Sequence, residues 1–172
     1  MYTALTEYFS GPWHARDRSL DQYELTGWAL VDKIKPHERV LDVGCGENLF
    51  KPKIKNLHGI DITDVGADEV VSIEEFQADE KFDVAFCLGS INFGDINVIR
   101  IQIEKVVAAL KPSNRIYWRC NPGQKDHGNE ECKDIDFFPW SFGHQRYFAD
   151  CYGYSILDMR MDGKRIYAEW IK

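Results

Sequence analysis

Apolar residues fall into short runs along the 172-residue chain, separated by polar segments. Two segments repeat apolar residues at a helical spacing: 19–35, which opens with the capping pair Ser19 and Gln22, and 97–112, which ends at Pro112. A further helix is expected within 139–153. The runs typical of buried strands are 39–43 (RVLDV), 57–61 (LHGID), 69–73 (EVVSI), 82–89 (FDVAFCLG) and 115–120 (RIYWRC).

The end of the chain has a different pattern. Residues 154–172 read as two strands joined at Asp162–Gly163, a dipeptide typical of tight hairpins. The preceding strands alternate with helical segments, which favours a parallel sheet with helices on both faces. We therefore predict an α/β fold that ends in an antiparallel hairpin.

Composition narrows the classes of function. The net charge is −7 and no block of Lys or Arg stands out, so binding to a nucleic-acid backbone is not expected. The sequence has no apolar run of the roughly 20 residues that a membrane helix needs, and no signal-peptide pattern at its start. The five cysteines include no CxxC pair, which favours reduced thiols. We expect a cytoplasmic protein with a small-molecule or protein partner.

A glycine turn follows the first expected strand. Asp42 ends that strand and Gly44 and Gly46 follow, at the sheet edge where open α/β folds bind ligands. Asp61, at the end of the second strand, is placed to accept hydrogen bonds from ribose hydroxyls. A dinucleotide turn would carry a third glycine at the position of Leu49. Its absence, with Pro52 nearby, favours a nucleoside ligand without phosphates and a shortened following helix.

Four segments resemble successive motifs of class I S-adenosylmethionine-dependent methyltransferases: VLDVGCGENLF (40–50), LHGIDIT (57–63), FDVAFCLGSINFGD (82–95) and ALKPSNRIYWR (109–119). The GCGENLFK stretch (44–51) is also similar to small phage-encoded members of that family. The resemblance implies a Rossmann-like three-layer sandwich with a mostly parallel seven-stranded sheet. It also implies one methyltransferase domain over 1–172, divided into an N-terminal arm and helix (1–35), a cofactor-binding core (36–120) and a substrate-side loop, helix and hairpin (121–172).

The resemblance also implies residue roles. Asp42 would hold the glycine turn and the cofactor's amino group, Asp61 the ribose, and Ile62 would lie against the adenine. Family members commonly carry a further glycine at Asn48, so this chain departs from the pattern there. The full implied S-adenosylmethionine site is Asp42, Gly44, Cys45, Gly46, Asp61, Ile62, Ser72, Ile73, Leu88 and Gly89.

The N-terminal arm has two interpretations. It is either a surface segment fixed by its aromatic residues, or a lid in which Trp13 shelters the cofactor and Arg16 pairs with the cofactor carboxylate. The turn after the fourth strand, with Ser90, Asn92 and Phe93, offers a small polar and aromatic rim for the methyl acceptor. It lacks the Asn/Asp-Pro-Pro-aromatic pattern of amino-methylating DNA enzymes. No metal site is predicted, and no residue is identified as catalytic.

We therefore predict a methyltransferase that transfers the methyl group of S-adenosylmethionine to a small molecule or a protein side chain. Two alternatives remain open. A noncatalytic module that binds S-adenosylmethionine or S-adenosylhomocysteine would also lack an identifiable base. An NAD-linked oxidoreductase is disfavoured by Leu49 and by the closing hairpin.

Overall fold

A computed structural model of the chain describes residues 2–13, 20–123 and 132–172. The strands form one seven-stranded sheet in the order β3-β2-β1-β4-β5-β7-β6. The first five strands are parallel to one another, whereas β7 is antiparallel to both β5 and β6. This confirms the predicted fold. The strand bounds are β1 Val40–Val43, β2 Leu57–Asp61, β3 Glu69–Val70, β4 Phe82–Leu88, β5 Leu110–Cys120, β6 Ser155–Asp162 and β7 Arg165–Ile171.

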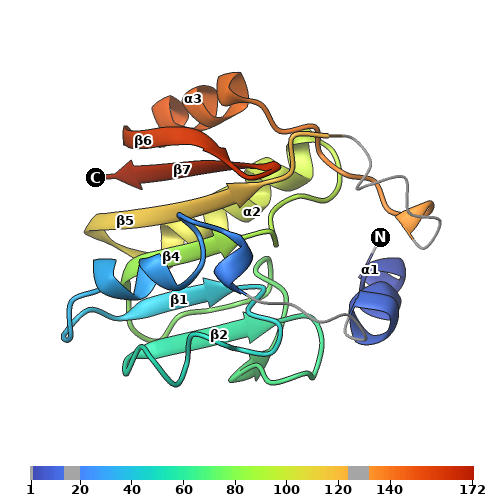
Figure 1. Cartoon of the computed structure of the whole chain (residues 1–172), viewed down its shortest axis with the longest axis horizontal. Helices are drawn as coiled ribbons and strands as arrows, with labels where there is room; N and C mark the ends of the chain where they lie inside the picture. The colour runs from blue at the N-terminus through green and yellow to red at the C-terminus, as the bar shows by residue number, and fades with distance from the viewer. Residues whose placement is uncertain (1, 14–19, 124–131) are drawn as a thin grey trace.

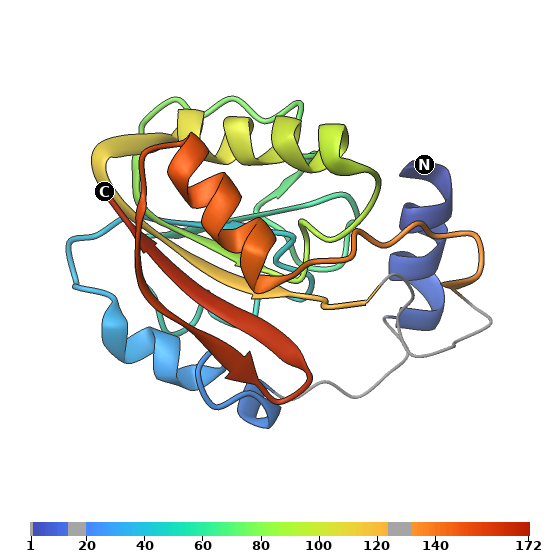
Figure 2. The same ribbon diagram turned by 90° about the horizontal axis from the view of Figure 1, so that it is seen from above.

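Helical segments lie on both faces of the sheet and at one edge. In Figures 1 and 2, α2 and α3 cover one face, η3 lies on the opposite face, and α1 lies beyond the carboxyl ends of the parallel strands. No helix among the described residues is long and apolar enough to cross a membrane. The bounds are α1 Tyr2–Tyr8, the π-helical turn η1 Phe9–Trp13, the 3-10 segments η2 Leu20–Gln22 and η3 Trp28–Lys33, and the helices α2 Ile96–Ala109 and α3 Phe142–Cys151.

The core has two layers because the strands alternate their side chains between the two faces. On β5, Trp118 packs in the larger cluster beneath α2 and α3, whereas Tyr117 packs in the cluster beneath η3. On β1, Leu41 likewise belongs to the larger cluster and Val40 to the cluster beneath η3. The central strands are therefore buried on both faces, which explains why their sequences read as continuous apolar runs.

The expected helix over 19–35 is wrong over its described part. Residues 20–33 form η2 and η3, separated by a turn. Asp162, at the end of β6, accepts hydrogen bonds at 2.9–3.1 Å from the backbone N–H groups of Glu24, Leu25 and Thr26, and one at 2.8 Å from the Thr26 hydroxyl. These donors are unavailable to a continuous helix, so a distant carboxylate overrides the local pattern.

Three smaller expectations also need correction. The strand expected over 69–73 comprises only Glu69–Val70, and the first helix was not foreseen at all. The helix expected to end at Pro112 ends at Ala109, so Pro112 belongs to β5. The Asp95 carboxylate caps this helix by accepting hydrogen bonds from the N–H groups of Asn97 and Val98.

Candidate functional site

A pocket opens at the carboxyl edge of β1, β2 and β4, beside α1. Its wall combines the glycine turn, the ends of these strands and the segments that follow them. Most of the residues proposed from the sequence share this wall, although they come from well-separated parts of the chain. They are Trp13, Asp42, Gly44, Cys45, Gly46, Asp61, Ile62, Ile73, Leu88, Gly89, Ser90, Asn92 and Phe93.

The glycine turn is shaped by the close approach of the segment that follows β4. Gly44 has a φ of +72°, and a Cβ there would lie 2.3 Å from the Cβ of Ser90. Both the backbone angle and the space therefore require glycine at this position. The N–H groups of Gly44 and Cys45 donate to the carbonyl of Ile60 at 2.8 and 3.0 Å, which fixes the turn to β2.

Asp61 is a buried carboxylate that joins the turn to the end of β2. Its Oδ2 accepts a 2.9 Å hydrogen bond from the Gly46 N–H, and its Oδ1 accepts bonds from the Thr63 N–H and hydroxyl at 2.9 and 2.7 Å. A carboxylate has about four acceptor positions, so these three bonds leave room for a ligand hydroxyl. Asp61 thus has two tasks available to it: holding the turn and accepting from a ligand.

The departure at Asn48 leaves the pocket wall unobstructed. Asn48 has a φ of +55°, a left-handed conformation that asparagine tolerates better than most residues. Its side chain packs against Gly59, where a Cβ would lie 2.7 Å from Asn48 Oδ1, and it donates to the carbonyl of Gly66 at 3.2 Å. Asn48 is absent from the pocket wall, so it replaces a glycine without filling the site. Residues 47–53 are turns, as expected from Leu49 and Pro52.

Unmet hydrogen-bonding capacity is concentrated in this pocket. In the part of the chain that the structure describes, seven buried side-chain polar atoms lack a hydrogen-bond partner, and five belong to lining residues. Such atoms are rare in folded proteins and call for an explanation. The five atoms are Glu74 Oε2, Ser90 Oγ, Gln102 Oε1, Arg119 Nη1 and Asn121 Nδ2.

Two of these atoms are acceptors that lie together between β3 and α2. Gln102 Nε2 donates to Glu74 Oε1 at 2.8 Å, which leaves Gln102 Oε1 and Glu74 Oε2 unpaired. Because the amide must turn its N–H group towards the carboxylate, the orientation of Gln102 is fixed by chemistry. Sequence analysis missed this pair because its members are 28 residues apart and belong to different elements.

The pocket is also lined by two buried groups that can carry opposite charges, Asp42 and Arg119. Burial raises the pKa of Asp42 to about 7, with the Arg119 charge opposing the rise and the Asp61 charge adding to it. Burial also lowers the pKa of Arg119. Arg119 Nη2 donates to the carbonyl of Leu88 at 2.6 Å, and its guanidinium carbon lies 4.3 Å from the centroid of the Tyr23 ring. Arg119 was also missed by sequence analysis.

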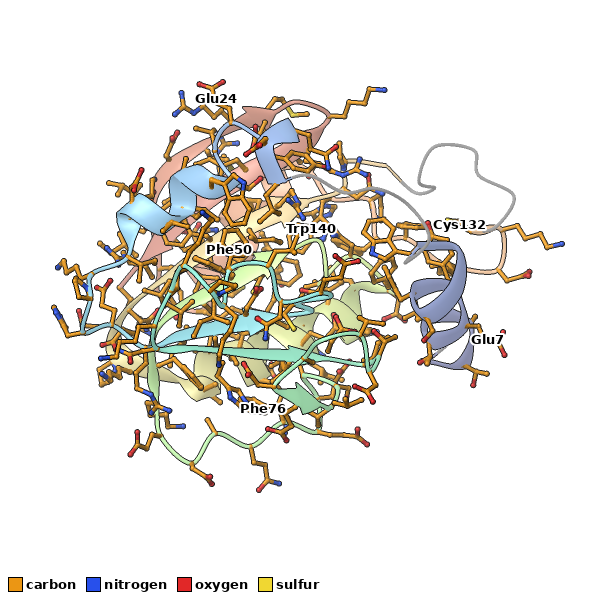
Figure 3. The ribbon with its side chains drawn as sticks, turned by 60° about the horizontal axis from the view of Figure 1, so that its bottom comes forward. Glu7, Glu24, Phe50, Phe76, Cys132 and Trp140 are labelled. Atoms are coloured by element: carbon orange, nitrogen blue, oxygen red, sulfur yellow. The ribbon has the colours of Figure 1, made fainter. Side chains whose placement is uncertain are left out.

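Five aromatic rings line the pocket, three of them from α1 and η1, and we call this group the aromatic roof: Tyr8, Phe9, Trp13, Phe93 and Phe137. The rings of Phe9 and Phe93 lie 5.6 Å apart, and those of Phe93 and Phe137 lie 5.1 Å apart. Leu5 and Tyr8 of α1 are buried in the same apolar cluster as Cys132. Figure 3 shows Cys132 beside α1, while Glu7 points away from the molecule.

Two residues proposed from the sequence are not among the described residues that line the pocket, for different reasons. Arg16 lies outside the described residues. Ser72 is buried and its hydroxyl donates to Glu75 Oε2 at 3.2 Å, but it does not line the pocket. Contacts between these two residues and a ligand therefore stay predictions.

Nucleophilic or metal chemistry has little support among the described residues. Burial and the nearby Asp42 charge raise the pKa of the Cys45 thiol, which keeps it protonated. Cys45 and the other four cysteines form no disulfides. Within the described ranges, no group of three or more His, Cys, Asp or Glu side chains is arranged to hold a metal ion.

Comparison with known proteins identifies the fold. Magnesium protoporphyrin IX methyltransferase from Synechocystis, solved with bound S-adenosylmethionine, matches with a TM-score of 0.74 and 15% identity, over 99% of this chain and 96% of that one. The N-methyltransferase NodS from Bradyrhizobium japonicum, in complex with S-adenosylhomocysteine, matches with a TM-score of 0.66 and 14% identity, over 99% of this chain and 97% of that one.

A third similar structure is 1,6-didemethyltoxoflavin-N1-methyltransferase from Burkholderia thailandensis, with a TM-score of 0.69 and 12% identity over 98% of this chain and 84% of that one. No family model and no curated protein matches the sequence. The chain thus has the fold of S-adenosylmethionine-dependent methyltransferases. At these identities the similarity defines the fold, and function has to be argued from the site.

Proposed function

We propose that the protein is an S-adenosylmethionine-dependent methyltransferase whose acceptor is a small molecule. The observation that carries the proposal is the agreement between the pocket's unpaired polar atoms and the cofactor. The exocyclic amino group of adenine offers two N–H donors, and Glu74 Oε2 with Gln102 Oε1 supplies two unpaired acceptors. Asp61 would accept from the ribose, as the sequence motif predicts.

The bound cofactor supplies an activated methyl group on a sulfonium, so the protein's own work is to bind, align and exclude water. The glycine turn gives backbone access to the methionine portion at Gly46, which lines the pocket and where a Cβ would meet no protein atom within 4 Å and would enter open space. The aromatic roof shields the pocket, and its ring faces suit a sulfonium cation. Alignment of acceptor and methyl group can supply roughly 7–11 kcal/mol of rate enhancement.

A small-molecule acceptor is favoured over a protein side chain because the aromatic roof covers the pocket. Two of the similar enzymes carry the name of a small molecule: magnesium protoporphyrin IX in one and 1,6-didemethyltoxoflavin in the other. Ser90, Asn92 and Phe93 would form the acceptor rim. Asn92 is already fixed, because its Oδ1 accepts from the Asn121 N–H at 2.8 Å and its carbonyl accepts from the Phe138 N–H.

A noncatalytic module that binds the same cofactor is the second candidate. It is favoured by the lack of an evident general base: the described acceptor rim is Ser90, Asn92 and Phe93, none of which is a carboxylate or histidine. An NAD-linked oxidoreductase is less suitable, because residues 47–53 are turns and offer no helix N-terminus to a pyrophosphate.

Calorimetry with S-adenosylmethionine, S-adenosylhomocysteine and NAD tests the proposal. We expect the first two to bind and NAD not to bind; binding of NAD alone would contradict it. The protein incubated with methyl-labelled cofactor and cell extract should transfer label to a small molecule that mass spectrometry can identify. Tight binding without any transfer in repeated extracts would favour the noncatalytic module.

A further inference from the structure

Asp42 and Arg119 line the same pocket, and neither forms an ion pair with any residue that the structure describes. Both belong to the face of the sheet that carries Val40 and Tyr117, because side chains alternate along β1 and β5. No hydrogen bond or ion pair joins Asp42 to Arg119, and none is made by the Asp42 carboxylate within the described part of the chain. A buried guanidinium and a buried carboxyl left apart in this way are costly to keep ionised unless a ligand pairs with them.

The strand register sets the distance that such a ligand has to span. Asp42 pairs with Phe86 on β4, and Leu88, two residues further along β4, pairs with Arg119. Arg119 reaches back over β4, where its Nη2 donates to the Leu88 carbonyl. The gap from the Asp42 carboxyl to the guanidinium therefore combines one strand spacing, about 4.8 Å, with two residues of rise along the strand, about 6.6 Å, and is on the order of 8 Å. An α-amino acid group, with its ammonium and carboxylate, fits a gap of that size.

The guanidinium is held ready for an anion. Its Nη2 is tied to the Leu88 carbonyl, its face lies against the Tyr23 ring, and a Cβ on Gly89 would lie 3.8 Å from Nη2. Nη1 is buried and has no hydrogen-bond partner among the residues that the structure describes. A fixed guanidinium with an unpaired terminal NH2 group is suited to a carboxylate.

We propose that Asp42 and Arg119 form a receptor for an α-amino acid zwitterion, in which Arg119 binds the carboxylate of the cofactor's methionine portion and Asp42 binds its ammonium group. The inference rests on the proposed function and extends it. It assigns the contact with the cofactor carboxylate to Arg119 of β5, whereas the sequence had suggested Arg16 of the N-terminal arm. Arg119 would make the protein discriminate between cofactors that carry this carboxylate and analogues that lack it.

The test compares ligands that differ in one charged group. Calorimetry would measure dissociation constants for S-adenosylhomocysteine, its decarboxylated analogue, its desamino analogue, and 5′-methylthioadenosine, which lacks the whole amino acid. The wild type should prefer S-adenosylhomocysteine to the decarboxylated analogue by about ten-fold or more. In Arg119→Met that preference should fall to within about three-fold, while Asp42→Asn should lose the preference over the desamino analogue instead.

Controls separate failure of the inference from failure of the proposed function. Arg160→Met removes an exposed arginine of β6 that pairs with Asp158, and it should keep both preferences. Binding of 5′-methylthioadenosine should stay within about three-fold in Arg119→Met. If it falls as much as that of S-adenosylhomocysteine, Arg119 is only structural and the inference is wrong. The inference is equally wrong if Arg119→Met keeps the wild-type preference. If the wild type binds none of the four nucleosides, the proposed function itself fails.

Discussion

At the scale of single residues, the two glycines of the turn can be distinguished experimentally. A Cβ at Gly44 meets Ser90 at 2.3 Å and also strains a φ of +72°, whereas a Cβ at Gly46 meets nothing within 4 Å and strains only a φ of +53°. Gly44→Ala should therefore lower the free energy of unfolding by about 1–3 kcal/mol more than Gly46→Ala. Urea denaturation of both variants without ligand measures this difference, and equal losses would contradict the packing described for the turn.

Asp61 should contribute to cofactor affinity beyond its hold on the turn. Asp61→Ala is expected to weaken S-adenosylmethionine binding by about 1–3 kcal/mol, because charge-assisted hydrogen bonds to ribose are lost. Thr63→Val is the matched control, since it removes only the 2.7 Å bond from the Thr63 hydroxyl to Asp61 Oδ1. We expect that control to bind almost normally in calorimetry. Wild-type affinity in Asp61→Ala would refute the ribose assignment.

The buried Asp42 predicts a dependence of stability on pH. Its pKa is raised to about 7 in the folded protein, above the ordinary value of 3.8, so between these values the folded state holds a proton that the unfolded chain has released. The contribution of Asp42 to the free energy of unfolding therefore falls as pH rises from about 4 to 7, by at most about 1.4 kcal/mol per pH unit. Asp42→Asn cannot ionise and should gain stability relative to wild type across this window.

Asp83→Asn provides a contrast of opposite sign. Partial burial acts to raise the pKa of Asp83, but the hydrogen bonds from the Arg39 N–H and from Lys111 together outweigh it, so the pKa is lowered. Its stabilising contribution is present above the unfolded pKa and is lost only as pH falls through the lowered folded value. Urea denaturation from pH 5 to 8 should therefore show a constant loss for Asp83→Asn and a changing difference for Asp42→Asn. Parallel curves for Asp42→Asn and wild type would show that Asp42 does not titrate as described.

At the scale of elements, the sequence predicted what local patterns control. The run at 57–61 matches β2 residue for residue, because a strand buried on both faces reads as a continuous apolar stretch. The turns at 47–53 followed from Leu49 and Pro52. The segment at 20–33 was mispredicted because the carboxylate that shapes it, Asp162, comes about 136 residues later. The same limit hid the pairing of Glu74 with Gln102 and the position of Arg119, which depend on how elements meet in space.

The turn between η2 and η3 should depend on the hairpin end of β6. Asp162→Ala removes the acceptor for three backbone N–H groups, of Glu24, Leu25 and Thr26, and would leave buried donors unpaired. We expect a loss of about 3 kcal/mol or more in the free energy of unfolding. Thr26→Val removes only the hydroxyl bond to Asp162 and should lose about 1 kcal/mol. Similar small losses in both variants, measured by urea denaturation, would show that the turn does not need Asp162.

At the scale of the whole molecule, we propose that residues 1–172 unfold as one unit. The two large apolar clusters lie on opposite faces of the same strands, since β4 contributes Ala85 to one and Phe86 to the other. Disruption of either cluster would therefore expose the strands on which the other cluster is built. The cluster around α1 differs, because its buried members are Leu5, Tyr8, Phe93, Cys132, Ile135 and Phe137, which lie outside the strands.

This separation makes α1 a candidate lid whose loss would spare the sheet. A protein that begins at residue 14 lacks α1 and η1, and with them three of the five rings of the aromatic roof, Tyr8, Phe9 and Trp13. Its melting temperature without ligand should fall by only a few degrees, whereas S-adenosylhomocysteine should dissociate about ten-fold faster or more, because its pocket is opened to water. Stopped-flow displacement measures that rate. Glu7→Gln, on the outward side of α1, is the control and should leave it unchanged. If the shortened protein releases the ligand at the rate of the full chain, α1 only straps the edge of the sheet.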